Sequence, residues 1–232
     1  MTRADEIAAN LAQVRGRIAA AAIAAGRAAA DVKLIVVTKT WPATDVRILA
    51  DLGVGDIGEN RDQEAAPKQS ACADLDLRWH FIGNLQRNKC RSVASYADVV
   101  HSIDRPEVVA ALAQGAQLAG RTLAVCLQVS LEPEPGTGRS GAAPGELTNL
   151  ADQVGREPSL VLAGLMAVAP LGVDPDGPFE LLAGIAARFQ IDHPEAKMIS
   201  AGMSHDLESA VRHGATHVRI GTAVLGRRPA LR

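Results

Sequence analysis

The chain has 232 residues, of which 47% are hydrophobic, enough to bury the core of one α/β barrel or of two smaller domains. Its 24 basic and 26 acidic residues leave no excess positive charge, which argues against nucleic acid as a partner. The sequence lacks a run of the roughly 20 apolar residues that a membrane helix needs, which predicts a soluble protein with no membrane partner.

The first 30 residues predict an amphipathic helix that packs on the outside of the fold. Ile7, Leu11, Val14 and Ile18 recur at helical spacing and would form one apolar face. A signal peptide is the alternative, because two arginines precede the apolar segment IAAAAIAAG. The three cysteines show no C-x-x-C spacing, which favours a reducing, cytoplasmic location.

Further along the chain, apolar strands alternate with segments of helical periodicity. The predicted strands are 33–38, 54–58, 78–82, 97–102, 122–130, 159–166, 196–200 and 217–220, and the predicted helices include 43–52, 105–119, 145–155, 178–189 and 205–213. About eight βα units predict a single TIM-type (β/α)8 barrel over residues 1–232, with 1–30 as an extra N-terminal helix. A doubly wound open sheet is the alternative fold, but no G-x-G-x-x-G follows the first strand.

Polar residues gather directly after the predicted strands, where barrels carry their functional loops. They are 38–40, 58–60, 80–86, 166–167, 200–204 and 219–222. The proline- and glycine-rich segments 132–146 and 169–178 also lie between a strand and a helix, so we interpret them as long loops on the same face.

Two of these loops could bind a phosphate group. Gly202 precedes a helix that Ser204 could cap, and helix starts carry unpaired amides and partial positive charge. Gly221 would let a ligand approach the backbone, and Thr222 supplies a hydroxyl. The loops after strands seven and eight are also where barrels often hold phosphate. An ordinary helix cap and an ordinary turn are the alternatives.

Lys39 ends the first strand on the same face. Desolvation there, and the charge of nearby Arg219, would favour its neutral amine, which can condense with an aldehyde. A ligand with an aldehyde and a phosphate therefore fits, and pyridoxal phosphate carries both. Its ring nitrogen takes an Asp or Arg partner, and arginine, which cannot accept a proton, would leave the ring a poorer electron sink. A surface lysine and a rim salt bridge are the alternatives.

Six motifs, in this order, resemble those of the pyridoxal phosphate homeostasis proteins, a single-domain relative of the alanine racemase barrel. They are LIVVTKTWP, IGEN, WHFIGNLQRNK, GLMAVAP, SAGMSHDLESAV and VRIGTAVLG. The resemblance implies an aldimine between Lys39 and pyridoxal phosphate, with Arg219 facing the ring nitrogen. It also implies phosphate contacts from Ser200, Ser204, Gly221 and Thr222. Gly202, in the loop between Ser200 and Ser204, would bind the cofactor as well, and Asn60, His80 and Met166 would be pocket residues.

The resemblance further implies a protein without catalytic residues that binds, buffers or delivers the cofactor in intracellular vitamin B6 homeostasis. Apo-enzymes that receive the cofactor would be its partners, and a monomer is the expectation from the family.

Two enzymatic alternatives remain. The first is a pyridoxal-phosphate-dependent amino-acid racemase, but the only tyrosine, Tyr96, precedes the fourth strand and would lie near the opposite end of the barrel. His80 could serve as an acid or base instead. The second is a phosphosugar aldolase or isomerase with Glu59 beside Lys39, although a structural hydrogen bond would explain Glu59 equally well. We expect no metal site, because the histidines of the last 30 residues bracket a helix instead of facing one another.

Overall fold

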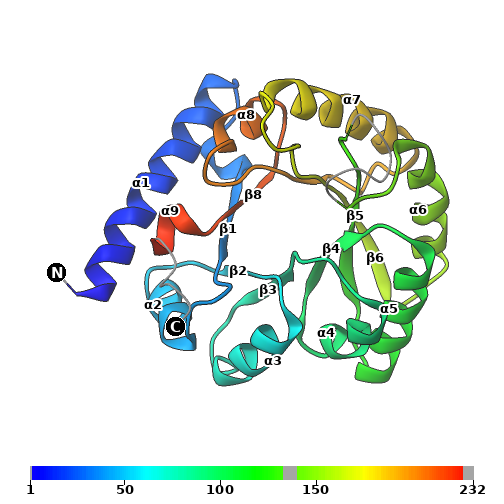
Figure 1. Cartoon of the computed structure of the whole chain (residues 1–232), viewed down its shortest axis with the longest axis horizontal. Helices are drawn as coiled ribbons and strands as arrows, with labels where there is room; N and C mark the ends of the chain where they lie inside the picture. The colour runs from blue at the N-terminus through cyan, green and yellow to red at the C-terminus, as the bar shows by residue number, and fades with distance from the viewer. Residues whose placement is uncertain (1, 133–139, 227–232) are drawn as a thin grey trace.

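The computed structural model describes residues 2–132 and 140–226. Within them, parallel strands β1 to β8 close into a barrel in sequence order, ringed by helices (Figure 1). The strands are β1 (Lys33–Val37), β2 (Asp56–Glu59), β3 (Arg78–Phe81), β4 (Val99–Ile103), β5 (Leu123–Gln128), β6 (Leu160–Met166), β7 (Met198–Ser200) and β8 (His217–Ile220). The helices are α1 (Arg3–Ala24), α2 (Ala43–Asp51), α3 (Asp62–Ala71), α4 (Cys90–Tyr96), α5 (Pro106–Ala119), α6 (Leu147–Gly155), α7 (Asp176–Asp192), α8 (Leu207–Arg212) and α9 (Thr222–Leu225). The predicted barrel with an N-terminal helix is confirmed.

Several element boundaries differ from the prediction by a few residues. Strand β5 ends at Gln128, two residues early, because Val129 pairs with Ala142 in an isolated bridge. Helices α3 and α4 occupy intervals for which we named no helix. The predicted loop 132–146 lies partly outside the described residues, which resume at Ser140 and form a short 3-10 turn over Pro144–Glu146.

Helix α1 packs on the barrel as expected. Thr2 and Asp5 form a capping box at its start, and the predicted apolar face is buried against α8 and α9. An ion pair of 2.7 Å between Arg17 and Glu208 joins α1 to α8. In the part of the chain that the structure describes, no helix is both long and apolar enough to cross a bilayer.

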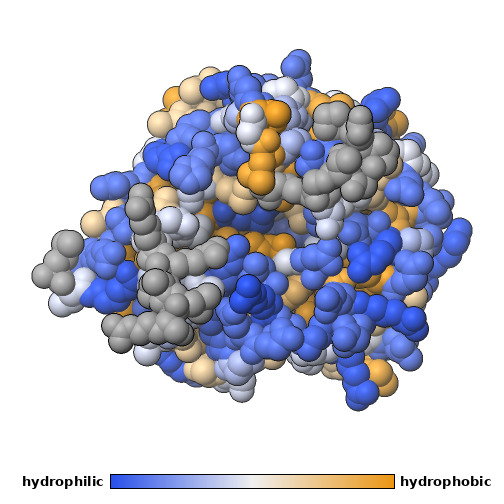
Figure 2. Space-filling model, in the orientation of Figure 1, coloured by the Kyte–Doolittle hydropathy of each residue, from blue (hydrophilic) through white to orange (hydrophobic). Residues whose placement is uncertain are grey.

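The hydrophobic core lies mainly between the barrel wall and its helices. One cluster combines residues of β3 to β6 with α4 to α7, and a second combines β1, β2 and β8 with α1, α2 and α8. The barrel interior is different, because His101 on β4 bonds directly to Ser200 on β7, a strand that is not its neighbour. Two such strands meet only across the interior, so the interior contains polar side chains. Figure 2 shows that the face viewed in Figure 1 is hollowed near its centre, inside the ring of helices.

Candidate functional site

Lys39 lies in a tight turn at the carboxyl end of β1. The Trp41 amide donates to the Thr38 carbonyl at 3.0 Å and closes the turn around Lys39. Thr40 has a φ of 69°, a left-handed conformation that costs a β-branched residue about 1–3 kcal/mol. Its amide donates to Glu64 Oε2 at 2.9 Å. These bonds hold the half-buried Lys39 in a defined place on the functional face.

A buried ion pair supports this turn from below. Lys68 on α3 donates to Glu59 Oε1 at 2.5 Å and to the Thr38 carbonyl at 2.7 Å. The Thr38 hydroxyl donates to the same carboxylate at 2.6 Å. Burial raises the pKa of Glu59, and Lys68 opposes that rise. Glu59 therefore links β1, β2 and α3, which agrees with the structural alternative considered for it.

Arg219 extends from β8 into the same end of the barrel and is 96% buried, with an exposed fraction of 4%. Its Nη1 donates to Ser200 Oγ at 2.7 Å, and its Nη2 donates to the Ala167 carbonyl at 3.0 Å. These two bonds come from the ends of β7 and β6, and both orient the guanidinium plane. Because arginine stays protonated in proteins, they place a permanent positive charge beneath the mouth of the barrel.

The loops after β7 and β8 lie side by side. The Arg219 amide donates to the Gly202 carbonyl at 2.9 Å, and Gly202 has a φ of 91°. The Ala223 amide donates to Ser204 Oγ at 3.4 Å, so the second loop is bonded to the first. A Cβ atom on Gly221 would lie 3.1 Å from the Val37 carbonyl oxygen, so the loop after β8 approaches the end of β1 closely.

The structure corrects one prediction, because Ser204 does not cap the helix after β7. A turn over Met203–Asp206 comes first, in which Asp206 Oδ1 accepts the Met203 amide at 2.5 Å. Helix α8 therefore begins at Leu207, with Asp206 as its N-cap residue. The Ser204 side chain instead joins the two loops.

Asn60 and Met166 lie at the ends of β2 and β6. Asn60 Oδ1 is buried and has no hydrogen-bond partner among the described residues. A Cβ atom on Gly83 would lie 2.1 Å from the Asn60 carbonyl oxygen, so the backbones that follow β2 and β3 are in close contact. Met166 is buried and pairs in register with Ser200.

His80 and Ser200 extend into the barrel interior. His80 Nε2 bonds to Asp56 Oδ1 at the amino end of β2, and His80 Nδ1 bonds to His101 at 2.9 Å. Ser200 lies between His101 and Arg219. Ligand contacts for both residues stay predictions.

Sequence reasoning missed three residues near these groups. Lys68 lies in a polar helix, where a lysine normally faces solvent, and no local pattern marks it. Asp56 lies inside the predicted strand 54–58 and was not singled out there. His101 leaves a weak signal in the sequence, because it is a polar residue within the largely apolar run DVVHSI. The alternation of side chains along a strand places it on the same face as Val99 and Ile103. Within the described residues, no three His, Cys, Asp or Glu side chains gather to hold a metal ion.

Comparison with known families defines the class of this barrel. Residues 3–229 match the family described as alanine racemase, N-terminal domain. The chain is 44% identical to the pyridoxal phosphate homeostasis protein of Mycobacterium leprae, over 97% of this chain and 93% of that protein. It is 38% identical to the pyridoxal phosphate homeostasis protein of Escherichia coli K12, over 97% of each chain.

Solved structures agree with this assignment. The structure of PipY from Synechococcus elongatus with pyridoxal phosphate bound has a TM-score of 0.82 and 35% identity, covering 95% of this chain and 100% of that one. The chain therefore belongs to the pyridoxal phosphate homeostasis protein family.

Proposed function

We propose that the protein binds pyridoxal 5'-phosphate covalently through Lys39 and takes part in cytoplasmic vitamin B6 homeostasis without catalytic turnover. The observation that carries the proposal is the convergence of Lys39, the buried Arg219 and the paired loops after β7 and β8 on one end of the barrel. The relatives named for this cofactor, and the PipY structure that contains it, support the same ligand.

The residues present fit the polar parts of the cofactor. The aldehyde would meet the Lys39 amine, forming a C=N bond with loss of water. The phosphate would be bound by the loops that contain Gly202, Ser204, Gly221 and Thr222. Asn60 Oδ1, buried without a described partner, is an acceptor available to the ring substituents.

Arg219 would face the ring nitrogen and donate a hydrogen bond to it. When bound, the cofactor supplies an aldehyde and an electron-withdrawing ring, and a protonated ring nitrogen makes that ring most effective. Arginine donates but does not give up its proton, so the nitrogen would stay unprotonated. Ser200, whose hydroxyl already bonds to Arg219 and His101, would act by holding Arg219, and His80 would act from within the barrel.

The racemase alternative finds little support. Tyr96 is the last residue of α4 and lies in the hydrophobic cluster between the barrel wall and the helices. Burial, followed by the carboxylates of Asp62 and Glu59, raises the pKa of its phenol. It is therefore a poor acid or base for a ligand on Lys39.

The three cysteines are buried and free, which suits a cytoplasmic protein. We expect a monomer that passes the cofactor to apo-enzymes.

Absorbance and reduction test the proposal. The purified protein with added pyridoxal phosphate should turn yellow, and borohydride should fix the label on Lys39 alone, as located by peptide mass spectrometry. Lys39→Ala should abolish the colour, whereas Lys33→Ala, which removes an exposed lysine at the opposite end of β1, should retain it. A colourless wild-type mixture, or a label on another lysine, would refute the proposal.

Turnover is tested separately. Single enantiomers of several amino acids are incubated with the loaded protein, and their optical rotation is followed. We expect no change, and racemization at an ordinary enzymatic rate of about 1 per second or more would establish the alternative.

A further inference from the structure

A continuous chain of hydrogen bonds crosses the interior of the barrel. Asp56 Oδ1 bonds to His80 Nε2 at 2.8 Å, and His80 Nδ1 bonds to His101 Nε2 at 2.9 Å. His101 Nδ1 bonds to Ser200 Oγ at 2.9 Å, and Ser200 Oγ accepts from Arg219 at 2.7 Å. Five strands contribute one residue each, so the chain runs from the amino-terminal end of the barrel to the charge beneath its opposite mouth.

The two ends of this chain determine where its protons lie. Arg219 can only donate, and ionised Asp56 can only accept. With both histidines neutral, one arrangement satisfies every bond: the Ser200 hydroxyl donates to His101 Nδ1, His101 Nε2–H donates to His80 Nδ1, and His80 Nε2–H donates to Asp56. Every donor therefore points away from Arg219, and such aligned bonds polarise one another.

The surroundings favour neutral histidines. Burial lowers the pKa of His80 and outweighs the effect of Asp56, which raises it. Burial lowers the pKa of His101 well below its ordinary value, and the positive charge of Arg219 adds to this. Other charged or titratable groups that act on the two rings come from β3, β8 and the residue before β4, and they are Arg78, His217 and Asp98. Lys33 on β1 acts on Asp56, whose pKa it helps to lower.

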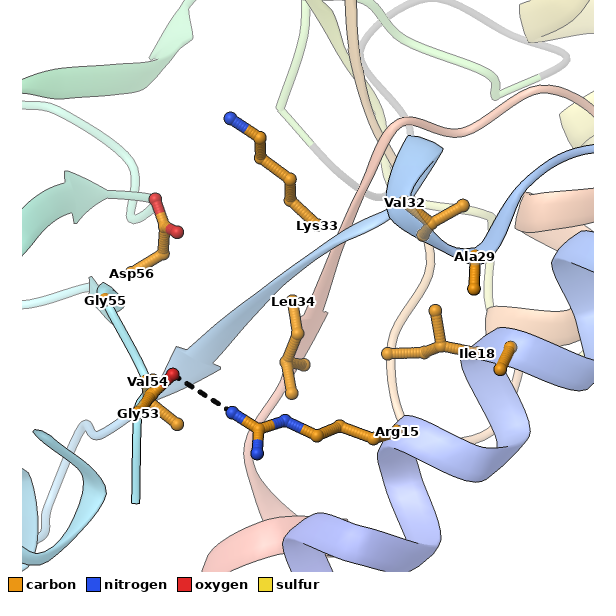
Figure 3. A pocket seen from close by; sticks show the side chains of 11 residues that line it. Arg15, Ile18, Ala29, Val32, Lys33, Leu34, Gly53, Val54, Gly55 and Asp56 are labelled. Atoms are coloured by element: carbon orange, nitrogen blue, oxygen red, sulfur yellow. Dashed lines mark hydrogen bonds between the residues drawn. The ribbon is translucent and has the colours of Figure 1, made fainter. Parts of the chain in front are cut away.

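The Asp56 end of the chain is accessible to solvent. The Asp56 side chain is 25% exposed, and the residue lies at the edge of a cavity of about 510 Å³ between α1 and the starts of β1 and β2. Figure 3 shows the Asp56 carboxylate and the Lys33 amine extending to the same side of β1, away from Ile18 of α1, while Arg15 bonds to Gly53. The carboxylate is therefore the one member of the chain, among those described above, that water and ions reach from this end.

We propose that Asp56, His80 and His101 are positioning residues, which orient Arg219 through Ser200 and couple the Asp56 charge at the amino-terminal end of the barrel to the cofactor mouth. The proposal rests on the proposed function, because Arg219 affects a ligand only if that ligand faces it. A purely structural role would satisfy the same buried polar groups without any effect of the Asp56 charge on Arg219.

The first test needs no cofactor. Long-range 1H–15N spectra of the apo-protein at about pH 7.5 to 8 should show His80 and His101 neutral and protonated on Nε2 alone. In Asp56→Asn, which retains an acceptor oxygen but removes the charge, the Arg219 guanidinium N–H resonances should shift. In Asp76→Asn, which changes an exposed carboxylate before β3 at the same end of the barrel, they should not. An Nδ1–H tautomer at either histidine, or unshifted Arg219 resonances in folded Asp56→Asn, would overturn the proposal.

The second test uses the loaded protein. Asp56→Asn should shift the absorbance maximum of the bound cofactor and weaken its binding about two- to thirtyfold, the range for mutations in coupled networks. Asp76→Asn should match wild type in both. If wild type binds no cofactor, the proposed function fails, whereas the resonance test still decides the coupling. If wild type binds and Asp56→Asn has the same spectrum and affinity, the coupling alone is refuted.

Discussion

Replacing Lys68 by methionine should destabilise the fold and loosen the turn that holds Lys39. Lys68 donates to Glu59 at 2.5 Å and to the Thr38 carbonyl at 2.7 Å, and the exposed fractions of the two charged side chains are 7% and 0%. Methionine has a similar length but removes both donors, so a carboxylate is left buried without its counter-ion. Removing one partner of a buried ion pair costs about 3–5 kcal/mol.

This loss should depend on pH in a defined direction. Burial already raises the pKa of Glu59 from its ordinary value of 4.5, while Lys68 lowers it. Without Lys68 the pKa of Glu59 in the folded state should rise further. A carboxyl whose pKa is higher in the folded state than in the unfolded state does not destabilise the fold below its unfolded pKa. The fold then loses stability as pH rises through the folded pKa, because the buried group must ionise. The deficit of Lys68→Met should therefore be largest near neutral pH and shrink below about pH 4.5.

Urea unfolding at several pH values measures the effect. Lys33→Met changes an exposed lysine of neighbouring β1 and should alter the free energy of unfolding by less than about 0.5 kcal/mol. Glu59→Gln in the Lys68→Met background should recover at least half of the loss, because it removes the unpaired charge. A loss below about 1 kcal/mol in Lys68→Met, or no recovery in the double variant, would refute the reasoning. Lys68→Met should also weaken cofactor binding, because Lys68 bonds to the Thr38 carbonyl in the turn that holds Lys39.

Four further changes test other features by the free energy of unfolding in urea. Gly83→Ala should cost about 1–3 kcal/mol, because the new Cβ atom would lie 2.1 Å from the Asn60 carbonyl oxygen, and an unchanged stability would contradict this contact. Gly16→Ala should add about 0.5–1 kcal/mol, since its Cβ meets nothing within 4 Å in the middle of α1; a loss would contradict the open space described there. Thr40→Gly should relieve the strain of a φ of 69° and leave stability unchanged or raised by about 1 kcal/mol, and a clear loss would show that its side chain is required. Burial, followed by the nearby His80 and Lys33, lowers the pKa of His217 to about 4. The stability of the fold that depends on a neutral His217 is therefore complete above pH 6.5 and is lost as pH falls toward 4. His217→Gln should therefore reduce the acid loss of stability over this range, by at most about 3 kcal/mol, and an unchanged pH slope would contradict the shift.

Local patterns in the sequence were enough to predict the barrel and its functional face. Runs such as LIVV predict buried strands because β-branched side chains suit a sheet and leave no polar group to satisfy. The alternation of strands and helices then predicts parallel strands whose carboxyl ends meet, and this places Lys39 and Arg219 at the same end. Boundaries shifted where a non-local bond intervened, as at Val129, which pairs with Ala142 beyond the end of β5.

The sequence by itself thus determined the order of the strands and which loops share a face, because both follow from short-range periodicity. Only the tertiary structure decided how the buried charges are paired. Glu59 meets Lys68 across a strand and a helix, and the chain from Asp56 to Arg219 draws on five strands. No local pattern encodes such partners, because a charged or imidazole side chain is stable inside a barrel only when distant segments supply its hydrogen bonds.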